Sequence, residues 1–253
     1  MKSDDGQEPL SVLCLMAHPD DAEILAAGTL ARLWREQGAK IHIASMAMGD
    51  LGSVEHPSAE IARIRHAEGI KAAALLGGSF ECLGERDLCV HYNPLVFQQA
   101  VALLRKVKAD LIITHAPSDY ILDHEECSRI ARAAAFGAPI PNLLPTVPPL
   151  ARIPWLYYAE PIEGLNALGR EVEPEFFIDI SSTIGDKEQM LACHASQRDW
   201  LKKHHGMDEY IEAMKRHGAH QGAKCNVAFA EGFVQHKGHA YPQDNLLKRL
   251  LGK

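Results

Sequence analysis

Two short segments of this chain concentrate histidine and carboxylate side chains, the residue types that bind divalent metal ions. The first reads Ala-His-Pro-Asp-Asp-Ala-Glu over residues 17–23 and follows a short apolar run. An imidazole and two or three carboxylates in so few residues are destabilised by like-charge repulsion, and a divalent cation removes that penalty. If a turn here begins a helix, His18 and Asp21 converge on one metal ion. Asp20 then points to the far side of the water molecule that this ion binds. The alternative is that both aspartates cap the helix and His18 lies at the surface.

The second segment, residues 115–125, follows another apolar run and contains His115, Asp119, Asp123 and His124. If the two apolar runs are adjacent strands of a doubly wound sheet, both segments lie at the crevice where such folds bind ligands. We therefore expect His124 to be the third metal ligand, and His115, Asp119 and Asp123 to orient it. The alternative for these three is a hydrogen bond that fixes the loop or caps the helix, and for His115 we favour this alternative over ligation.

Short apolar runs alternate with helical patterns along the chain, which is typical of an α/β fold. The expected strands span residues 12–16, 41–46, 79–83, 110–115, 155–159 and 176–180. The expected helices span residues 24–37, 58–76, 94–107, a stretch from about 124, 182–195 and 197–214. Ser58 and Asn93 are the expected N-caps of the second and third helices. This alternation predicts βαβ units, and therefore right-handed crossovers and a mostly parallel sheet of strand order 3-2-1-4-5.

The chain has 253 residues, of which 47% are apolar and 23% are charged, so it is long enough to bury a sizeable core. We interpret residues 1–253 as a single domain, with a flexible N-terminus over about residues 1–10. A C-terminal extension of helix and loop is expected over about residues 182–253. The proline-rich stretch 137–154 is typical of an irregular loop.

Charge and composition exclude several classes of protein. The net charge is −7 and no basic block is present, so neither nucleic acid nor an anionic membrane is expected as a partner. The six cysteines show no C-x-x-C spacing, which indicates reduced thiols. The N-terminal segment lacks a signal-peptide pattern, and the apolar stretches are too short for a membrane span, so we expect a cytoplasmic protein. Six histidines near the C-terminus are expected to be solvated rather than to form a second metal site: His204, His205, His217, His220, His236 and His239.

In these motifs the sequence resembles the PIG-L/LmbE-type zinc-dependent N-deacetylases. The resemblance rests on AHPDDAE at residues 17–23 and on Asp123-His124 in the second segment. Weaker blocks extend it over nearly the whole chain: Gly49-Asp50-Leu51-Gly52-Ser53, Arg65 with Glu68, Leu76-Gly77, Lys187, His194-Ala195-Ser196-Gln197 and Ala230-Glu231-Gly232-Phe233.

The resemblance implies a Rossmann-like three-layer α/β/α fold that binds one zinc ion through His18, Asp21 and His124, with Asp20 as general base. It also implies a small-molecule substrate, an amino sugar or sugar conjugate that loses an acyl group, mostly acetyl. Zinc lowers the pKa of its bound water towards about 7 and polarises the amide carbonyl, while the base takes the water's proton and passes it to the departing amine. Relatives often form trimers or hexamers, so a homo-oligomer is expected.

One position departs from the family pattern. The family's second block usually reads His-Pro-Asp-His, and its first histidine stabilises the developing oxyanion, whereas this chain has Ile121 there. Loss of one oxyanion donor typically lowers the rate by about 10²–10³. Zinc alone could suffice for an easier substrate, another donor such as His194, His115 or Tyr120 could substitute, or activity could be lost. We rank substitution first. The alternatives are an amidase or other metal-dependent hydrolase acting on a different conjugate, and a metal-binding module with reduced catalysis.

The resemblance further implies that Arg65 and Asp87 hold sugar hydroxyls. Three more polar residues near the crevice are candidate substrate contacts: Asp119, Tyr120 and His194. Ordinary structural roles compete with these interpretations. Arg65 could pair with Glu68 on the surface of one helix, Asp87 could be a turn residue, and His194 could supply a favourable charge at a helix C-terminus.

Overall fold

The computed structural model describes residues 8–198 and 209–252. The strands are β1 (Ser11–Met16), β2 (Lys40–Ala47), β3 (Ser79–Glu85), β4 (Leu111–Thr114), β5 (Trp155–Ala159), β6 (Phe176–Asp179) and β7 (Ala230–Gln235). The α-helices are α1 (Asp21–Leu25), α2 (Ala27–Gln37), α3 (Ser58–Ala74), α4 (Pro94–Lys106), α5 (Leu122–Gly137), α6 (Ile184–Ala192), α8 (Glu209–Lys224) and α9 (Leu246–Leu251). Two short 3-10 helices are η1 (Pro141–Leu143) and η2 (Ile162–Gly164).

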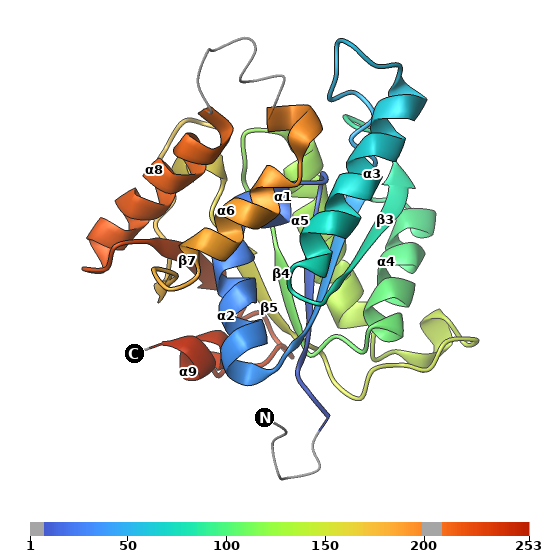
Figure 1. The fold of residues 1–253 in the computed structure, drawn as a ribbon. Helices are drawn as coiled ribbons and strands as arrows, with labels where there is room; N and C mark the ends of the chain where they lie inside the picture. Colours follow the sequence, from blue (N-terminus) through green and yellow to red (C-terminus); the bar gives the residue numbers. More distant parts are fainter. Residues whose placement is uncertain (1–7, 199–208, 253) are drawn as a thin grey trace.

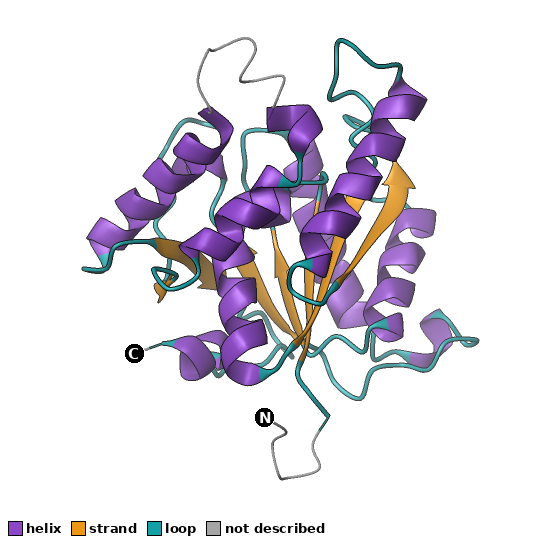
Figure 2. Cartoon of the chain, viewed as in Figure 1, coloured by secondary structure: helices purple, strands orange, loops and turns teal. Residues whose placement is uncertain are grey.

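All seven strands belong to one sheet, in the order β3-β2-β1-β4-β5-β7-β6. Strands β1 to β5 are parallel to their neighbours, and β7 runs antiparallel to both β5 and β6. Helices α4 and α5 cover one face, and α2, α3 and α6 cover the other (Figures 1 and 2). The predicted α/β class, the three layers and the order of the first five strands are confirmed. Since β1 and β4 are adjacent, the two metal-binding segments predicted after them begin side by side.

Strand β1 lies at the centre of this arrangement and shows why the sheet is so apolar. Val12, Cys14 and Met16 contact the core on one face, whereas Leu13 and Leu15 contact the core on the other. All five side chains are fully buried. A parallel strand that is covered on both faces requires a continuous apolar run rather than an alternating one, as the sequence has here.

The helix boundaries differ from the expected ones where local chemistry intervenes. The expected helix 24–37 is divided at Ala26, whose φ of −140° is not helical, into α1 and α2. The predicted cap at Ser58 is wrong: Ser58 is the first residue of α3, and its hydroxyl donates to Asp50 instead. The predicted cap at Asn93 is confirmed, because its side chain accepts hydrogen bonds from two backbone N–H groups in the first turn of α4.

The C-terminal part is more than the expected extension of helix and loop, because it also supplies β7. Its buried Glu231 lies 2.6 Å from Lys187 Nζ and accepts hydrogen bonds from two backbone N–H groups at the start of α2. Because this short strand contains a charged side chain, its sequence does not resemble the apolar run of a buried strand. The expected helix 197–214 includes residues 199–208, which lie outside the described residues, and α8 begins at Glu209.

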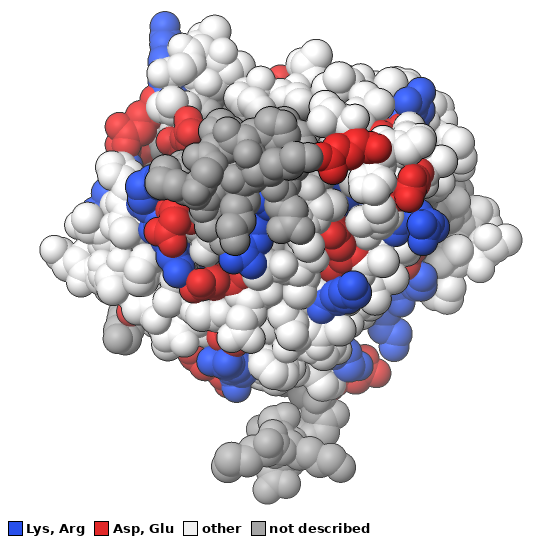
Figure 3. Space-filling model, turned by 45° about the horizontal axis from the view of Figure 1, so that its top comes forward, with Lys and Arg blue, Asp and Glu red and all other residues white. Residues whose placement is uncertain are grey.

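Two further observations concern the helices and the charged side chains of the surface. Within the described ranges, no helix combines the length and the apolar composition needed to cross a membrane. On the face that includes the carboxyl ends of the parallel strands, acidic and basic side chains are interspersed (Figure 3).

Candidate metal centre and adjoining cavity

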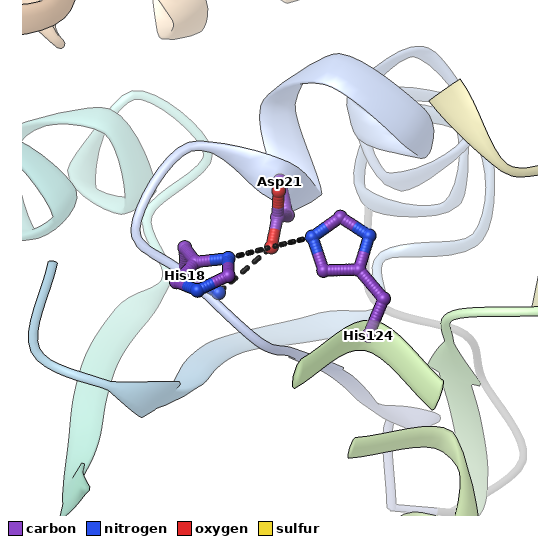
Figure 4. A group of neighbouring side chains, drawn as sticks. All are labelled: His18, Asp21 and His124. Carbon is purple, nitrogen blue, oxygen red and sulfur yellow. Dashed lines mark hydrogen bonds and ion pairs between the residues drawn. The ribbon is translucent and has the colours of Figure 1, made fainter. Parts of the chain in front are cut away.

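Three side chains from two distant segments meet at the carboxyl ends of β1 and β4 (Figure 4). His18 lies between β1 and α1, Asp21 begins α1, and His124 lies in the first turn of α5. One ligand atom of each lies within 4.8 Å of the others. Asp21 Oδ2 is 3.4 Å from His18 Nδ1 and 3.5 Å from His124 Nε2. The backbone N–H of His18 also donates to Asp21 Oδ2, over 2.7 Å, which fixes the carboxylate between the two rings.

Each of the two imidazoles has a second carboxylate behind it. Asp119 Oδ2 lies 3.1 Å from His124 Nδ1, as predicted for a residue that orients this ring. Asp123 Oδ2 lies 3.0 Å from His18 Nε2, so Asp123 orients His18 rather than His124, contrary to expectation. Asp123 is held in turn by backbone N–H groups of the loop that follows β3. A carboxylate on the outer nitrogen fixes the orientation and tautomer of a metal-binding histidine.

His115 takes the loop-fixing role that was the favoured alternative. Its Nε2 accepts a hydrogen bond from the backbone N–H of Ala17 over 2.9 Å, which ties the two segments together. The ring is fully buried and stacks on His124, with 3.8 Å between the ring centres. Burial, together with the neighbouring His124, lowers the pKa of His115 to about 4, so the ring is neutral. One nitrogen each of His115 and His124 and one Asp119 oxygen also lie within 4.8 Å of one another, in a wholly buried group.

The donor chemistry at this point fits a divalent metal ion. Burial opposes protonation of His18, yet the carboxylates of Asp123 and Asp21 raise its pKa to about 10. The pKa of His124 is likewise raised, against the effect of burial, by Asp21 and Asp119. The Nε2 of His124, which is the nitrogen nearest to Asp21, is buried and has no hydrogen-bond partner among the described residues. Carboxylates that surround two imidazoles favour positive charge between them, and two histidines with one aspartate are an accepted zinc donor set.

Asp20 lies next to this centre in an unusual conformation. Its φ of 109° is in the left-handed region, which side chains other than glycine rarely adopt without a compensating interaction. Arg65 Nη2 lies 3.1 Å from Asp20 Oδ1 and also donates to the Pro19 carbonyl. The Tyr210 hydroxyl donates to Asp20 Oδ2 over 2.5 Å. Burial raises the pKa of the Asp20 carboxyl, and Arg65 only partly offsets this.

The contacts of Arg65, Glu68 and His194 distinguish between the interpretations of these polar residues. Arg65 pairs with Asp20 and not with Glu68, which instead accepts hydrogen bonds from the backbone N–H and hydroxyl of Ser196. His194 is fully buried, with its Nε2 3.4 Å from Glu23 Oε2, a position that favours a structural role over a substrate contact.

A cavity of about 530 Å³ opens beside the metal centre. Its lining includes Asp20, Ile121 and three of the five expected substrate contacts, namely Arg65, Asp87 and Tyr120. The other two are not part of this lining: His194 is buried beside Glu23, and Asp119 is buried against His124. The aliphatic side chain at Ile121 therefore does face the space where an oxyanion donor was expected.

Asp87 and Tyr120 differ in how firmly they are held. Asp87 accepts hydrogen bonds from the backbone N–H groups of Gly49 and Leu51, over 2.8 and 3.0 Å, so it fixes this loop as well as lining the cavity. Tyr120 is 60% exposed, and its ring meets His124 edge-on with 5.2 Å between the ring centres.

Helix α8 supplies cavity residues that sequence reasoning missed. Tyr210, Met214 and His217 lie on one face of this helix and line the cavity. His217 was expected to be solvated, and its place in the cavity wall corrects that expectation; His204 and His205 lie outside the described residues. These three residues are spaced four and three positions apart, so the sequence shows that they share one face of a helix. The sequence does not show which part of the protein that face contacts.

Comparisons with known proteins agree with this geometry. Residues 13–135 match the family model described as PIG-L, GlcNAc-PI de-N-acetylase. A 4-oxalmesaconate hydratase of Pseudomonas putida is 24% identical, with 90% of this chain and 87% of that protein covered. A 1D-myo-inositol 2-acetamido-2-deoxy-alpha-D-glucopyranoside deacetylase of Rhodococcus opacus is 26% identical, with 74% of this chain and 81% of that protein covered. The structure of N,N'-diacetylchitobiose deacetylase from Pyrococcus horikoshii shares the fold, with a TM-score of 0.77, 23% identity, and coverage of 96% of this chain and 92% of that one.

Proposed function

This chain belongs to the PIG-L family, and from that premise we propose that it is a metal-dependent hydrolase that removes an acyl group, acetyl in the simplest case, from the amide nitrogen of a small sugar-like substrate. The observation that carries the proposal is the convergence of His18, Asp21 and His124 beside a cavity that also exposes Asp20. The deacetylase of Rhodococcus opacus acts, by its name, on a 2-acetamido sugar joined to inositol.

In this proposal His18, Asp21 and His124 hold one zinc ion. The buried, unpartnered Nε2 of His124 and the carboxylates behind both rings support that role. When bound, the ion supplies a Lewis acid that polarises a carbonyl and lowers the pKa of water. Other divalent ions also bind such a donor set, so the choice of zinc rests on the family.

Asp20 is the proposed general base. Its carboxylate faces the cavity, and a raised pKa makes it a stronger base than an exposed aspartate. Arg65 and Tyr210 each hold one of its oxygens, which keeps the carboxylate in place while a lone pair remains for water. Asp20 takes a proton from the attacking water and returns it to the nitrogen of the departing amine, so that no covalent bond to the protein is needed.

A second candidate reaction is the addition of water to a carbon–carbon double bond. Two observations favour it: Ile121 offers no oxyanion donor, and a relative that aligns over 90% of this chain is named a hydratase. Within the described lining, however, a single guanidinium, that of Arg65, accompanies four carboxylates, those of Asp20, Asp21, Asp87 and Glu163. This charge suits a neutral amide better than a substrate that carries several carboxylates, so amide hydrolysis remains the preferred reaction.

The experiment that tests this function measures metal content and product together. We expect about one zinc per chain and acetate release from N-acetylglucosamine or N,N'-diacetylchitobiose, lost on chelation and restored by zinc. A matched Asp20→Asn variant should keep the metal and release no acetate. Zinc-loaded protein that hydrates unsaturated carboxylic acids but releases no acetate would instead support the second reaction. Light scattering on the same sample tests the expected trimer or hexamer.

A further inference from the structure

Glu160, the residue that follows β5, is a buried carboxylate without a hydrogen-bond partner. It is only 5% exposed, and neither of its side-chain oxygens accepts a hydrogen bond from any described residue. Among the described residues, His217 lies near this carboxylate: its Nε2 is 3.9 Å from Glu160 Oε2, beyond hydrogen-bond distance. Burial of an unpaired carboxylate destabilises a fold, so such a group calls for a functional explanation.

His217 connects this carboxylate to the cavity. It lines the cavity wall on the same face of α8 as Tyr210, whose hydroxyl contacts Asp20. Tyr210 and His217 are seven positions apart, which at 1.5 Å per residue is roughly 10 Å along the helix axis. One end of this helix face therefore meets the reacting centre, and His217 lies about two turns away from it.

Two glycines, Gly232 and Gly164, pack against the pair. A Cβ added at Gly232 would come within 2.3 Å of Glu160 Oε2, so only glycine fits behind the carboxylate. A Cβ at Gly164 would lie 3.8 Å from His217 Cε1 and 4.0 Å from Glu160 Oε1. Burial, with help from Lys187, lowers the pKa of His217 to about 4, so the ring is neutral and has one N–H and one lone pair.

We propose that His217, which Glu160 faces, binds a hydroxyl group of the substrate about two helical turns along α8 from Tyr210, the residue that contacts Asp20. Glu160 Oε2 faces the Nε2 side of the ring at 3.9 Å, without a hydrogen bond to it. In this proposal the other ring nitrogen binds the hydroxyl, which can donate to a ring lone pair or accept from a ring N–H. The substrate therefore extends beyond a single N-acetylated sugar ring and carries a hydroxyl on its second unit. This inference rests on the proposed function.

The test compares a one-ring and a two-ring probe. In His217→Leu, KM for N,N'-diacetylchitobiose should rise about tenfold, as expected for one lost hydrogen bond, with kcat changed less than about twofold. KM for N-acetylglucosamine should stay unchanged. His220→Leu, on the exposed side of the same helix, is the matched control and should change neither constant. Equal effects of His217→Leu on both probes, or a loss of kcat alone, would overturn the proposal.

A binding measurement separates this inference from the proposed reaction. In zinc-loaded protein labelled with ¹⁵N at histidine, N,N'-diacetylchitobiose should shift the His217 ring signals, and Glu160→Gln should change the ratio of the two His217 tautomers. If neither probe is deacetylated but these shifts occur, the proposed reaction fails and the binding role stands. If the probe does not shift the His217 ring signals, or if the ratio of His217 tautomers is the same in Glu160→Gln as in the wild type, the role assigned here is wrong.

Discussion

Replacement of Glu160 by glutamine should make the protein more stable at alkaline pH than the wild type, although it removes a charge next to His217. Burial raises the pKa of Glu160 from about 4.5 to about 7, in spite of the opposing charge of Lys224. Because the folded state holds this proton more tightly than the unfolded state does, ionisation of Glu160 destabilises the fold. The free energy of unfolding should therefore fall as the pH rises from about 4.5 to about 7 and level off above that.

The two pKa values set the size of the effect. A raised pKa of about 7 corresponds to a penalty of about 3 kcal/mol near pH 8 and about 1 kcal/mol near pH 5. Glutamine has nearly the same shape but does not ionise, so Glu160→Gln escapes this penalty. The difference in unfolding free energy between variant and wild type should thus shift by about 2–3 kcal/mol, in favour of the variant, between these two pH values.

Urea unfolding followed by far-UV circular dichroism measures this difference at each pH. A buried amide has its own cost, but that cost does not depend on pH and cancels in the comparison. Glu212→Gln is the control, since Glu212 is exposed on the same helix as His217, and its difference from wild type should vary by less than about 0.5 kcal/mol. If Glu160→Gln shows the same flat profile, the carboxylate is paired in solution and the reasoning about its burial is wrong.

Three further predictions concern the metal centre and the cavity. Asp20→Asn should retain zinc, measured by elemental analysis, while kcat for acetate release falls by about 10²-fold or more; loss of the metal would make Asp20 a ligand rather than a base. His124→Ala should weaken zinc binding by orders of magnitude in a chelator competition, and Asp119→Ala by about 10–100-fold; unchanged affinity in both would remove His124 from the ligand set. Ile121→His should raise acetate release towards about 10²-fold if the cavity only lacks an oxyanion donor, whereas no change or a fall would indicate a cavity shaped for another reaction.

Residues close in sequence to a strand end could be placed from the sequence, because topology constrains them. His18 and His124 are 106 positions apart, yet the parallel pairing of β1 with β4 brings the segments that contain them together. The partner of each carboxylate could not be foreseen, since Asp119 and Asp123 are four residues apart and either could face either ring. Sequence spacing does not determine such choices; the direction of the first turn of α5 does.

Contacts made by the C-terminal part were the hardest to predict. Arg65 and Glu68 have the spacing of a helical ion pair, but tertiary partners compete for both: Arg65 meets Asp20, and Glu68 meets Ser196. A buried carboxylate gains more from an arginine than a surface pair does, so the long-range contact prevails over the local one. Strand β7 was missed for a related reason, since its Glu231 is stabilised inside the protein by the start of α2 and by Lys187.

The division of the site between two parts of the chain explains how one family can contain different reactions. The family match covers residues 13–135, which hold the three proposed metal ligands and Asp20. Much of the opposite cavity wall, including Tyr210 and His217, comes from beyond that range. We infer that the centre proposed here is compatible with either deacetylation or hydration, because the remaining wall selects which bond is presented to it. On this argument the identity of the substrate is to be sought on α8 and around Glu160, and not among the metal ligands.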